Sequence, residues 1–299
     1  MLKGFTKKII AITILIIVFI GALLVFFSDI GNEISPTPQG ESLPLVIEYE
    51  GIRVNAVRDN IGISEADVLL AFHGTTMDNS RIMEAAMTML KNTRKIIKQD
   101  NIVIISVAYP EEGMLFGDNT KEAEAVLLWT KHRASQELGI QINRIYLIGH
   151  SQGGYLVTRL NTMHETDGVI ANGVGPIDLS FHCRLVEGRE MKYAHEKSKS
   201  EVCVLLKQKY GSVFANPTPY TERSLVHFAS GYKSRIMFVQ GMQDGKVQMR
   251  LWPEFKKKVS RCIDCAQYEF LEIENAGHGA AFENDEAIRA INDFLQLRQ

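Results

Sequence analysis

The first long hydrophobic feature of the chain lies near its N-terminus. Residues 9–27 contain no charged side chain, and Thr13 is their only clearly polar interruption. As a helix they would span roughly 28 Å, close to the thickness of a bilayer's hydrocarbon core. Three lysines precede the segment, and no basic residue follows it before Arg53. The pattern predicts an uncleaved membrane anchor in residues 1–28, a single pass that places the rest of the chain on the extracytoplasmic side.

A cleaved signal peptide is the alternative reading of this segment. Such peptides have a shorter apolar region of about 7–15 residues and a cleavage site of the small-x-small type. The exit at residues 26–29, Phe-Phe-Ser-Asp, fits that site poorly. Residues 29–44 contain Pro36 and Pro38 and show neither a helical nor a strand period, which indicates a linker. We therefore expect the folded domain to occupy residues 45–299.

From Leu45 onward, short strand signals alternate with helix signals. Residues 45–49 and 52–57 alternate around Glu50-Gly51, which predicts an antiparallel hairpin. Further runs typical of strands lie at 68–72, 102–107, 144–148, 169–174, 235–240 and 268–273. Helical spacing separates them at 82–90, 121–138, 155–160, 253–259 and 280–297. Because parallel neighbours need crossover connections, the alternation predicts an α/β fold with a doubly wound, mostly parallel sheet.

One long stretch breaks the alternation. Between Val174 and Arg235 lie about 60 residues without a convincing strand, including a basic, helical piece at 191–209. An excursion of this length inside a compact sheet is usually functional. We predict a lid-like insertion at about 176–234, and the alternative is an insertion remote from any site.

Composition and charge narrow the function classes. The chain has 299 residues, of which 45% are hydrophobic and 23% charged, as in an ordinary globular protein. Its net charge of −2 does not indicate the strongly basic surface that is typical of nucleic-acid-binding proteins. The histidines and cysteines show no zinc-binding spacing. We therefore expect neither a nucleic-acid partner nor a metal.

Candidate chemistry begins at the turn that follows the strand at 144–148. Residues 149–154 read Gly-His-Ser-Gln-Gly-Gly and open a helix. The glycines allow Ser151 to occupy a sharp turn, where the helix N-terminus favours developing negative charge. Ser151 is the candidate nucleophile, and an incidental serine in a glycine-rich turn is the alternative. His150 adjoins it, but neighbouring residues on such a turn point in different directions.

A serine nucleophile needs a base and an orienting acid. His278 follows the last strand in Asn-Ala-Gly-His-Gly and is the candidate base. Asp244 follows the strand at 235–240 and is the preferred acid, with Asp178, after the strand at 169–174, as the second candidate. The chain order Ser151, Asp244, His278 is the one expected for this chemistry on an α/β sheet.

The negative oxygen that forms on attack needs two backbone donors. Gln152 N–H, directly after the nucleophile, is the first candidate. The loop at 72–76, Phe-His-Gly-Thr-Thr, ends a strand and offers Thr75 N–H as the second. We expect His73 to anchor this loop through hydrogen bonds.

Together these motifs resemble the α/β-hydrolase superfamily over about residues 45–299. The resemblance is carried by AFHGTT at 71–76, GHSQGG at 149–154, GMQD at 241–244 and AGHG at 276–279. They are similar to the dienelactone-hydrolase, prolyl-oligopeptidase and carboxylesterase branches. Ser151 stands where dienelactone hydrolases carry cysteine, and no propeller precedes the domain, which disfavours an oligopeptidase proper. The resemblance implies hydrolysis of a small-molecule or acyl ester without metal or organic cofactor.

Four cysteines complete the candidates. Cys183 and Cys203 lie in the excursion, and Cys262 and Cys265 form a Cys-x-x-Cys before the last strand. An even count in an exported domain suggests two disulfides, whereas an intracellular Cys-x-x-Cys suggests metal or redox chemistry. Three pairings are open, as are free thiols, and we favour 183–203 with 262–265.

The function expected from the sequence is a membrane-anchored serine hydrolase that acts on carboxylic esters. One alternative is a non-catalytic binding protein on the same fold, because a fold does not imply a function. Retention of the whole triad and both oxyanion loops argues against it. Another alternative is an acyltransferase or peptidase-type relative. Hydrolase and transferase differ in the access of water to the acyl-enzyme, which is a tertiary property.

Overall fold

The structure, a computed structural model, describes residues 42–59, 62–76, 79–109, 119–188 and 197–296. These contain an eight-stranded sheet in the order β1-β2-β4-β3-β5-β6-β7-β8. Its strands are β1 Leu43–Tyr49, β2 Ile52–Arg58, β3 Glu65–Phe72, β4 Ile102–Ala108, β5 Gln141–His150, β6 Gly168–Asn172, β7 Ile236–Gly241 and β8 Tyr268–Ile273. β2 pairs antiparallel with both of its neighbours, β1 and β4, whereas every other pair of neighbouring strands, from β4 to β8 in the sheet order, is parallel. The predicted hairpin and the mostly parallel sheet are confirmed.

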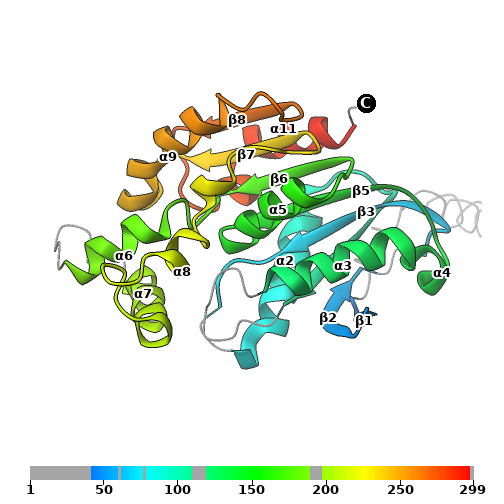
Figure 1. Ribbon diagram of the computed structural model, residues 1–299. Helices are drawn as coiled ribbons and strands as arrows, with labels where there is room; N and C mark the ends of the chain where they lie inside the picture. The colour runs from blue at the N-terminus through cyan, green and yellow to red at the C-terminus, as the bar shows by residue number, and fades with distance from the viewer. Residues whose placement is uncertain (1–41, 60–61, 77–78, 110–118, 189–196, 297–299) are drawn as a thin grey trace, which may run out of the picture. The chain divides into compact units, whose positions relative to one another are not determined.

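Helices cover both faces of the sheet (Figure 1). One face carries α3 Thr120–His132, α5 Gln152–Met163 and α9 Lys246–Val259; the other carries α2 Ile82–Ile96, α10 Ala280–Glu283 and α11 Asp285–Gln296. Side chains alternate along each strand, so Val68, Leu70 and Phe72 pack into the first core while Leu69 and Ala71 pack into the second. Burial on both faces explains why β3 and β4 read as continuous apolar runs.

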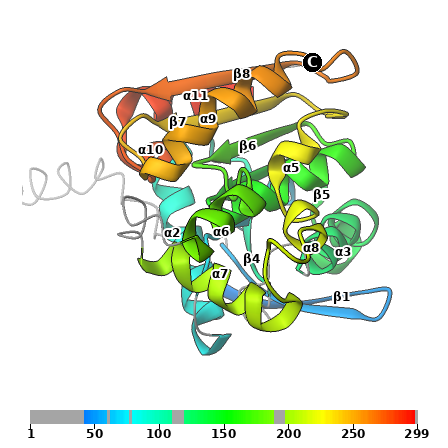
Figure 2. The ribbon, with the colours of Figure 1, turned by 60° about the vertical axis from the view of Figure 1, so that its left-hand side comes forward.

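The excursion after β6 folds as a small helical layer beyond the carboxyl ends of the strands (Figures 1 and 2). It contains α6 Leu179–Glu187, α7 Lys197–Tyr210, α8 Thr218–Thr221 and a 3₁₀ turn at Leu225–Phe228, and its described residues include no strand. The layer has its own apolar cluster, which includes Leu179, Cys183, Val202, Cys203, Leu206, Val213 and Tyr220.

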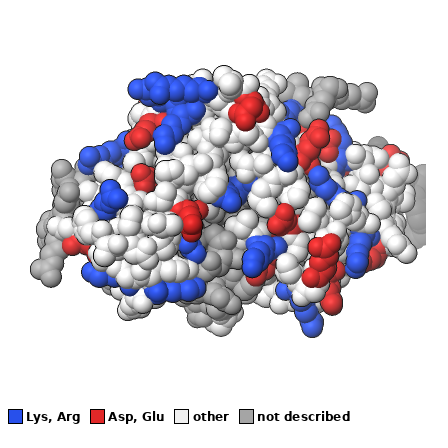
Figure 3. All heavy atoms as spheres, viewed as in Figure 1, with Lys and Arg blue, Asp and Glu red and all other residues white. Residues whose placement is uncertain are grey.

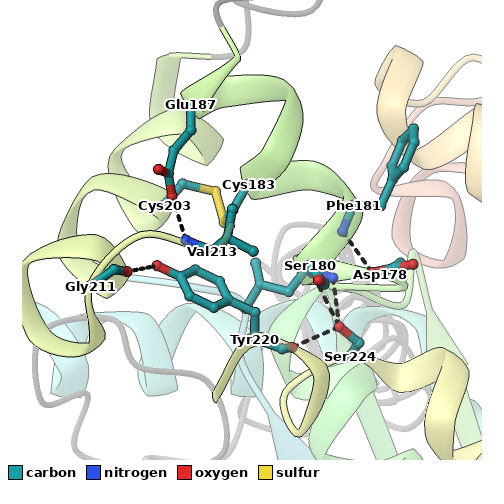
Figure 4. Close-up of a disulfide and its surroundings, with 11 residues drawn as sticks. Asp178, Ser180, Phe181, Cys183, Glu187, Cys203, Gly211, Val213, Tyr220 and Ser224 are labelled. Atoms are coloured by element: carbon teal, nitrogen blue, oxygen red, sulfur yellow. Dashed lines mark hydrogen bonds between the residues drawn. A yellow bond between two sulfur atoms is a disulfide. The ribbon is translucent and has the colours of Figure 1, made fainter. Parts of the chain in front are cut away.

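Two disulfides form in the favoured pairing. Cys183–Cys203 ties α6 to α7, and Cys262–Cys265 closes a short loop between α9 and β8. Figure 4 shows that hydrogen bonds surround the first of these disulfides. Glu187 accepts a bond from Val213 N at 2.8 Å, and Tyr220 Oη donates to Gly211 O at 2.6 Å. Both cysteines of this disulfide are buried, and these hydrogen bonds join the segments around it.

We expect loss of the 183–203 disulfide to destabilise the fold measurably. In the loop-entropy description, closing a loop over a separation of 20 residues contributes about 3 kcal/mol. The separation of 3 residues at Cys262–Cys265 gives about half as much. Denaturant unfolding of Cys183→Ser/Cys203→Ser and of Cys262→Ser/Cys265→Ser measures both. Equal losses from the two double variants would contradict this account.

Three predicted helices have different bounds in the structure. The helix expected at 121–138 is split at Arg133 into α3 and α4 Ala134–Leu138. The helix expected at 280–297 is split because Asn284 is extended and its side chain accepts bonds from the first N–H groups of α11. The third, α9, begins at Lys246 rather than at Pro253. Pro253 lies on the exposed face of α9, where a carbonyl left without an N–H partner can bind water.

Some predictions concern residues outside those described. The expected anchor at 9–27 and most of the linker belong to this part of the chain. Within the residues that are described, no helix is both long and apolar enough to cross a membrane. On the face seen in Figure 3, basic and acidic side chains are interspersed.

Candidate active site

Ser151 occupies a strained turn between β5 and α5. Its backbone angles, a φ of 56° and a ψ of −115°, lie in a region that residues other than glycine rarely adopt. The turn is held by Ser151 N, which donates to Asn172 O at 2.9 Å. Glycines allow the tight packing: a Cβ on Gly149 would lie 2.1 Å from Gly153 O, and a Cβ on Gly153 would lie 2.0 Å from Phe72 O. The glycines of the motif are therefore required by the close approach of β5, β3 and α5.

Gly153→Ala is expected to destabilise the protein by at least about 2 kcal/mol more than Gly154→Ala. The nearest atom to a Cβ on Gly154 lies 3.2 Å away, against 2.0 Å at Gly153. Both residues lie in the first turn of α5, so the gain in helix propensity is the same and the difference reports the clash. Denaturant unfolding of both variants measures it. Equal stabilities would show that β3 can move away.

His278 and Asp244 are in direct contact. His278 Nδ1 lies 2.7 Å from Asp244 Oδ2, and the side chains are 36% and 3% exposed. The loop that carries His278 approaches two strand ends closely. A Cβ on Gly241 would lie 2.0 Å from Gly277 O, and one on Gly173 would lie 2.8 Å from His278 O. Small residues at the ends of β6 and β7 thus allow His278 to lie against the sheet edge.

Asp244 is held as a carboxylate. Burial alone raises its pKa, but the hydrogen bond and charge of His278, with bonds from Gln240 and Gly245, bring the pKa below its ordinary value. Gln240 Nε2 donates to Oδ2 at 3.0 Å and Gly245 N to Oδ1 at 2.6 Å. When Asp244 accepts the Nδ1 proton of His278, the other ring nitrogen, Nε2, is left free to accept a proton.

Asp178, the second candidate acid, has a different partner. Its Oδ1 accepts a bond from Phe181 N at 2.8 Å, and it is the N-cap of α6 (Figure 4). The residue lines the same cavity as Ser151, but the hydrogen bond of the His278 ring goes to Asp244. Asp178 therefore fits a structural role at the start of α6.

The loop after β3 is anchored by His73, as expected. His73 Nδ1 donates to Gly74 O at 2.6 Å, its ring stacks on Tyr109 with centroids 4.2 Å apart, and Tyr109 Oη donates to its carbonyl oxygen. Burial lowers the pKa of His73 to about 4, so the ring is neutral. A Cβ on Gly74 would lie 3.3 Å from Ser151 Cβ, which places this loop directly beside the turn that carries Ser151.

A cavity of about 760 Å³ opens at these residues. Ser151, His278 and Thr75 line it. Gln152 is buried as the first residue of α5, and at that position its backbone N–H has no acceptor within the helix. Apolar lining comes from several helices and from the segment before α6, with Met89, Ile177, Leu179, Val202, Leu251 and Phe282 among the contributors. The excursion therefore forms part of the cavity wall.

The side chains of Ser151 and His278 both reach this cavity, but in the described part of the chain no hydrogen bond joins Ser151 Oγ to His278. In an enzyme without bound substrate such a bond is often long and shortens only when the substrate binds.

Among the described residues, one group of three His, Cys, Asp or Glu side chains is close enough to share a metal ion. It comprises Cys262, Asp264 and Cys265, which lie in the loop before β8. The two sulfur atoms are bonded to each other, so neither is a thiolate that could bind metal.

Sequence reasoning missed two sets of polar residues around this site. Gln248, on the cavity wall, donates to Gln240 Oε1 at 3.1 Å, and Gln240 in turn bonds to Asp244. Asn172, fully buried at the end of β6, bonds to His150 and to the His278 loop. Gln240 and Asn172 could have been found from the sequence, because each is a polar residue at the carboxyl end of an otherwise apolar strand.

Comparison with solved structures identifies the architecture. The esterase Pf2001 of Pyrococcus furiosus matches with a TM-score of 0.60 and 16% identity, over 89% of this chain and 94% of that one. Est1E from Butyrivibrio proteoclasticus matches with a TM-score of 0.56 and 16% identity, over 84% and 97%. The acylaminoacyl peptidase of Pyrococcus horikoshii matches with a TM-score of 0.59 and 13% identity, over 89% of this chain but only 44% of the peptidase.

These likenesses show the α/β-hydrolase fold, as the sequence motifs predicted. At such low identity they show the fold alone. No family model matches the chain, and no curated protein is similar to it in sequence.

Proposed function

We propose that this protein is a serine hydrolase that cleaves carboxylic esters. The observation that carries the proposal is the 2.7 Å contact of His278 with Asp244, in a cavity that His278 shares with Ser151 on its strained turn. A histidine whose Nδ1 is bound to a buried carboxylate is arranged to accept a proton at Nε2. The neighbours in fold include esterases, which agrees with this chemistry.

The reaction follows from these roles. Ser151 Oγ attacks the ester carbonyl carbon while His278 Nε2 takes the hydroxyl proton, and Asp244 stabilises the imidazolium. The N–H groups of Thr75 and Gln152 bind the negative oxygen of the tetrahedral intermediate. Collapse expels the alcohol, which takes the proton from His278. Water, deprotonated by the same base, then attacks the acyl-enzyme, releases the acid and restores Ser151.

A peptidase is the second candidate, because one neighbour in fold is an acylaminoacyl peptidase. Esters are the better substrates on chemical grounds, since an alkoxide or phenolate leaves more readily than an unprotonated amide nitrogen, and the ester carbonyl is less stabilised by resonance. The test is a screen of the full-length protein, purified in detergent, against short- and long-chain aryl esters and peptide amides. We expect turnover of esters and covalent labelling by an organophosphonate probe. Turnover of amides at comparable rates would favour the peptidase, and absence of both turnover and labelling would favour a binding protein.

We propose also that residues 9–27 anchor the protein in a membrane, with the catalytic domain on the extracytoplasmic side. The support is the length of this charge-free segment and the lysines on its N-terminal side. Membrane fractionation combined with N-terminal sequencing tests the proposal. We expect an intact N-terminus in the membrane fraction. A mature protein that begins near residue 29 and washes off membranes would show cleavage and secretion.

A further inference from the structure

The carboxyl end of β6 carries a polar residue that the mechanism above does not use. Asn172 is fully buried and follows Gly-Val-Ile-Ala in its strand. Its backbone oxygen accepts the bond from Ser151 N that holds the nucleophile turn. Its side chain points to the segment after β8, which carries His278 and begins α10. A single residue thus contacts both halves of the proposed catalytic machinery.

The orientation of the Asn172 amide is fixed by its partners. Ala281 N can only donate, so the atom 3.1 Å from it is the oxygen Oδ1. The nitrogen Nδ2 therefore faces His150 Nδ1 at 2.8 Å and the carbonyl oxygen of His278 at 3.3 Å. Every polar atom of this side chain is used, and each bond is made to the nucleophile side or to the base side of the site.

The first of these bonds decides where the proton of His150 lies. Since Asn172 Nδ2 donates to His150 Nδ1, that nitrogen carries a lone pair and the ring proton is on Nε2. The His150 ring lies 4.9 Å from the His278 ring, measured between centroids. Burial, with the nearby charge of His278, lowers the pKa of His150 to about 3, although Asp244 acts in the opposite direction. His150 is therefore uncharged beside a base that must become positive, and a second positive charge there would oppose that step.

We propose that Asn172 is a positioning residue: it holds the Ser151 turn and the His278 loop in their positions relative to each other and keeps His150 in its neutral, Nε2-protonated form. The kinetic part of this inference rests on the proposed hydrolase function, whereas the tautomer of His150 does not. Asp244, after β7, contacts the His278 ring directly. Further charged and titratable groups line the same cavity as the two rings: Glu283 on α10, His73 after β3, Asp178 and His182 at α6, and the Arg81–Glu84 pair at the start of α2.

The test is Asn172→Asp in the full-length protein, purified in detergent with ¹⁵N-labelled histidine. Aspartate has the size of asparagine and keeps the oxygen that accepts the bond from Ala281 N. In place of the donor Nδ2 it has a second oxygen, which would face the lone pairs of His150 Nδ1 and of the carbonyl oxygen of His278. We expect the proton of His150 to move to Nδ1. We expect kcat on an aryl ester to fall on the order of 10²-fold with little change in KM, because the base loop is displaced. The acid limb of kcat/KM should move to higher pH, because an added carboxylate favours protonated imidazoles.

Asn161→Asp is the matched control. Asn161 is equally buried and bridges two backbone groups, Ser234 O at 2.9 Å and Ser234 N at 2.8 Å, near the end of α5 remote from Ser151. It should lose stability without any change in the pH profile or in the His150 signal. If both variants lower kcat alike and leave the pH profile unchanged, Asn172 is merely structural and the proposal fails.

The wild-type spectrum decides the matter if Asn172→Asp does not fold. A wild-type His150 that carries its proton on Nδ1, or that titrates near pH 6, overturns the proposal, whereas an Nε2-protonated ring that stays neutral down to pH 5 supports it. Failure of the proposed function has another signature. In that case the wild-type protein neither hydrolyses esters nor reacts with the phosphonate probe, while the spectrum still reports the tautomer of His150.

Discussion

Replacing Ser151 by alanine is expected to abolish labelling by an organophosphonate probe and to lower kcat on an aryl ester on the order of 10⁶-fold. The hydroxyl supplies the only atom that can form the acyl-enzyme in the proposed mechanism. Water held at the same position lacks the orientation that the strained turn imposes on Ser151 Oγ. Binding of the substrate should be little affected, because the cavity wall is otherwise unchanged.

Ser106→Ala is a suitable control for this experiment. Ser106 is fully buried in β4, and its Oγ has no hydrogen-bond partner among the residues that the structure describes. Its loss should leave labelling and turnover intact and cost little stability. Intact-mass measurement after exposure to the probe, together with initial rates, gives both readouts. Full esterase activity of Ser151→Ala would show that the proposed nucleophile is wrong.

The second large effect is expected from Asp244→Asn, roughly a 10⁴-fold loss of kcat by analogy with the triad template. Asparagine has the same shape but can present an N–H to His278 Nδ1. The ring then keeps its proton on Nε2, the nitrogen that must accept the proton of Ser151. The bonds that Asp244 accepts from Gln240 and Gly245 can be kept by the amide oxygen only in part. Hence the loss should lie in kcat, with the fold retained.

Asp178→Asn provides the matched comparison. Asp178 caps α6 through Phe181 N, and asparagine is an equally good N-cap residue. We expect Asp178→Asn to keep most of the activity, as measured by kcat and KM on the same ester. If Asp178→Asn causes the large loss of kcat and Asp244→Asn only a small one, then Asp178 is the acid and the assignment of Asp244 is wrong.

Much of the fold could be predicted from local pattern. β3 and β4 read as strands because both of their faces are buried, which leaves continuous runs of apolar residues. The glycines around Ser151 could be interpreted in the same way, since a sharp strand-to-helix turn needs them whatever the rest of the chain does. Errors in helix bounds arose where one residue decided the outcome. Asn284 ends a helix by capping the next, and Pro253 is tolerated inside α9 on its exposed face.

The choice between the two candidate acids shows what only the tertiary structure decided, namely which carboxylate contacts His278. Asp178 and Asp244 both follow a strand, and the sequence favoured Asp244 without establishing which of the two lies against His278. In the sheet, β7 lies next to β8, so the carboxyl ends that carry Asp244 and His278 meet, whereas Asp178 is taken up by the start of α6. The role of Asn172 is of the same kind, because its partner His278 is 106 residues away. Hydrophobic periodicity determines which face of a strand is buried, but which strand ends become neighbours depends on the packing of the whole sheet.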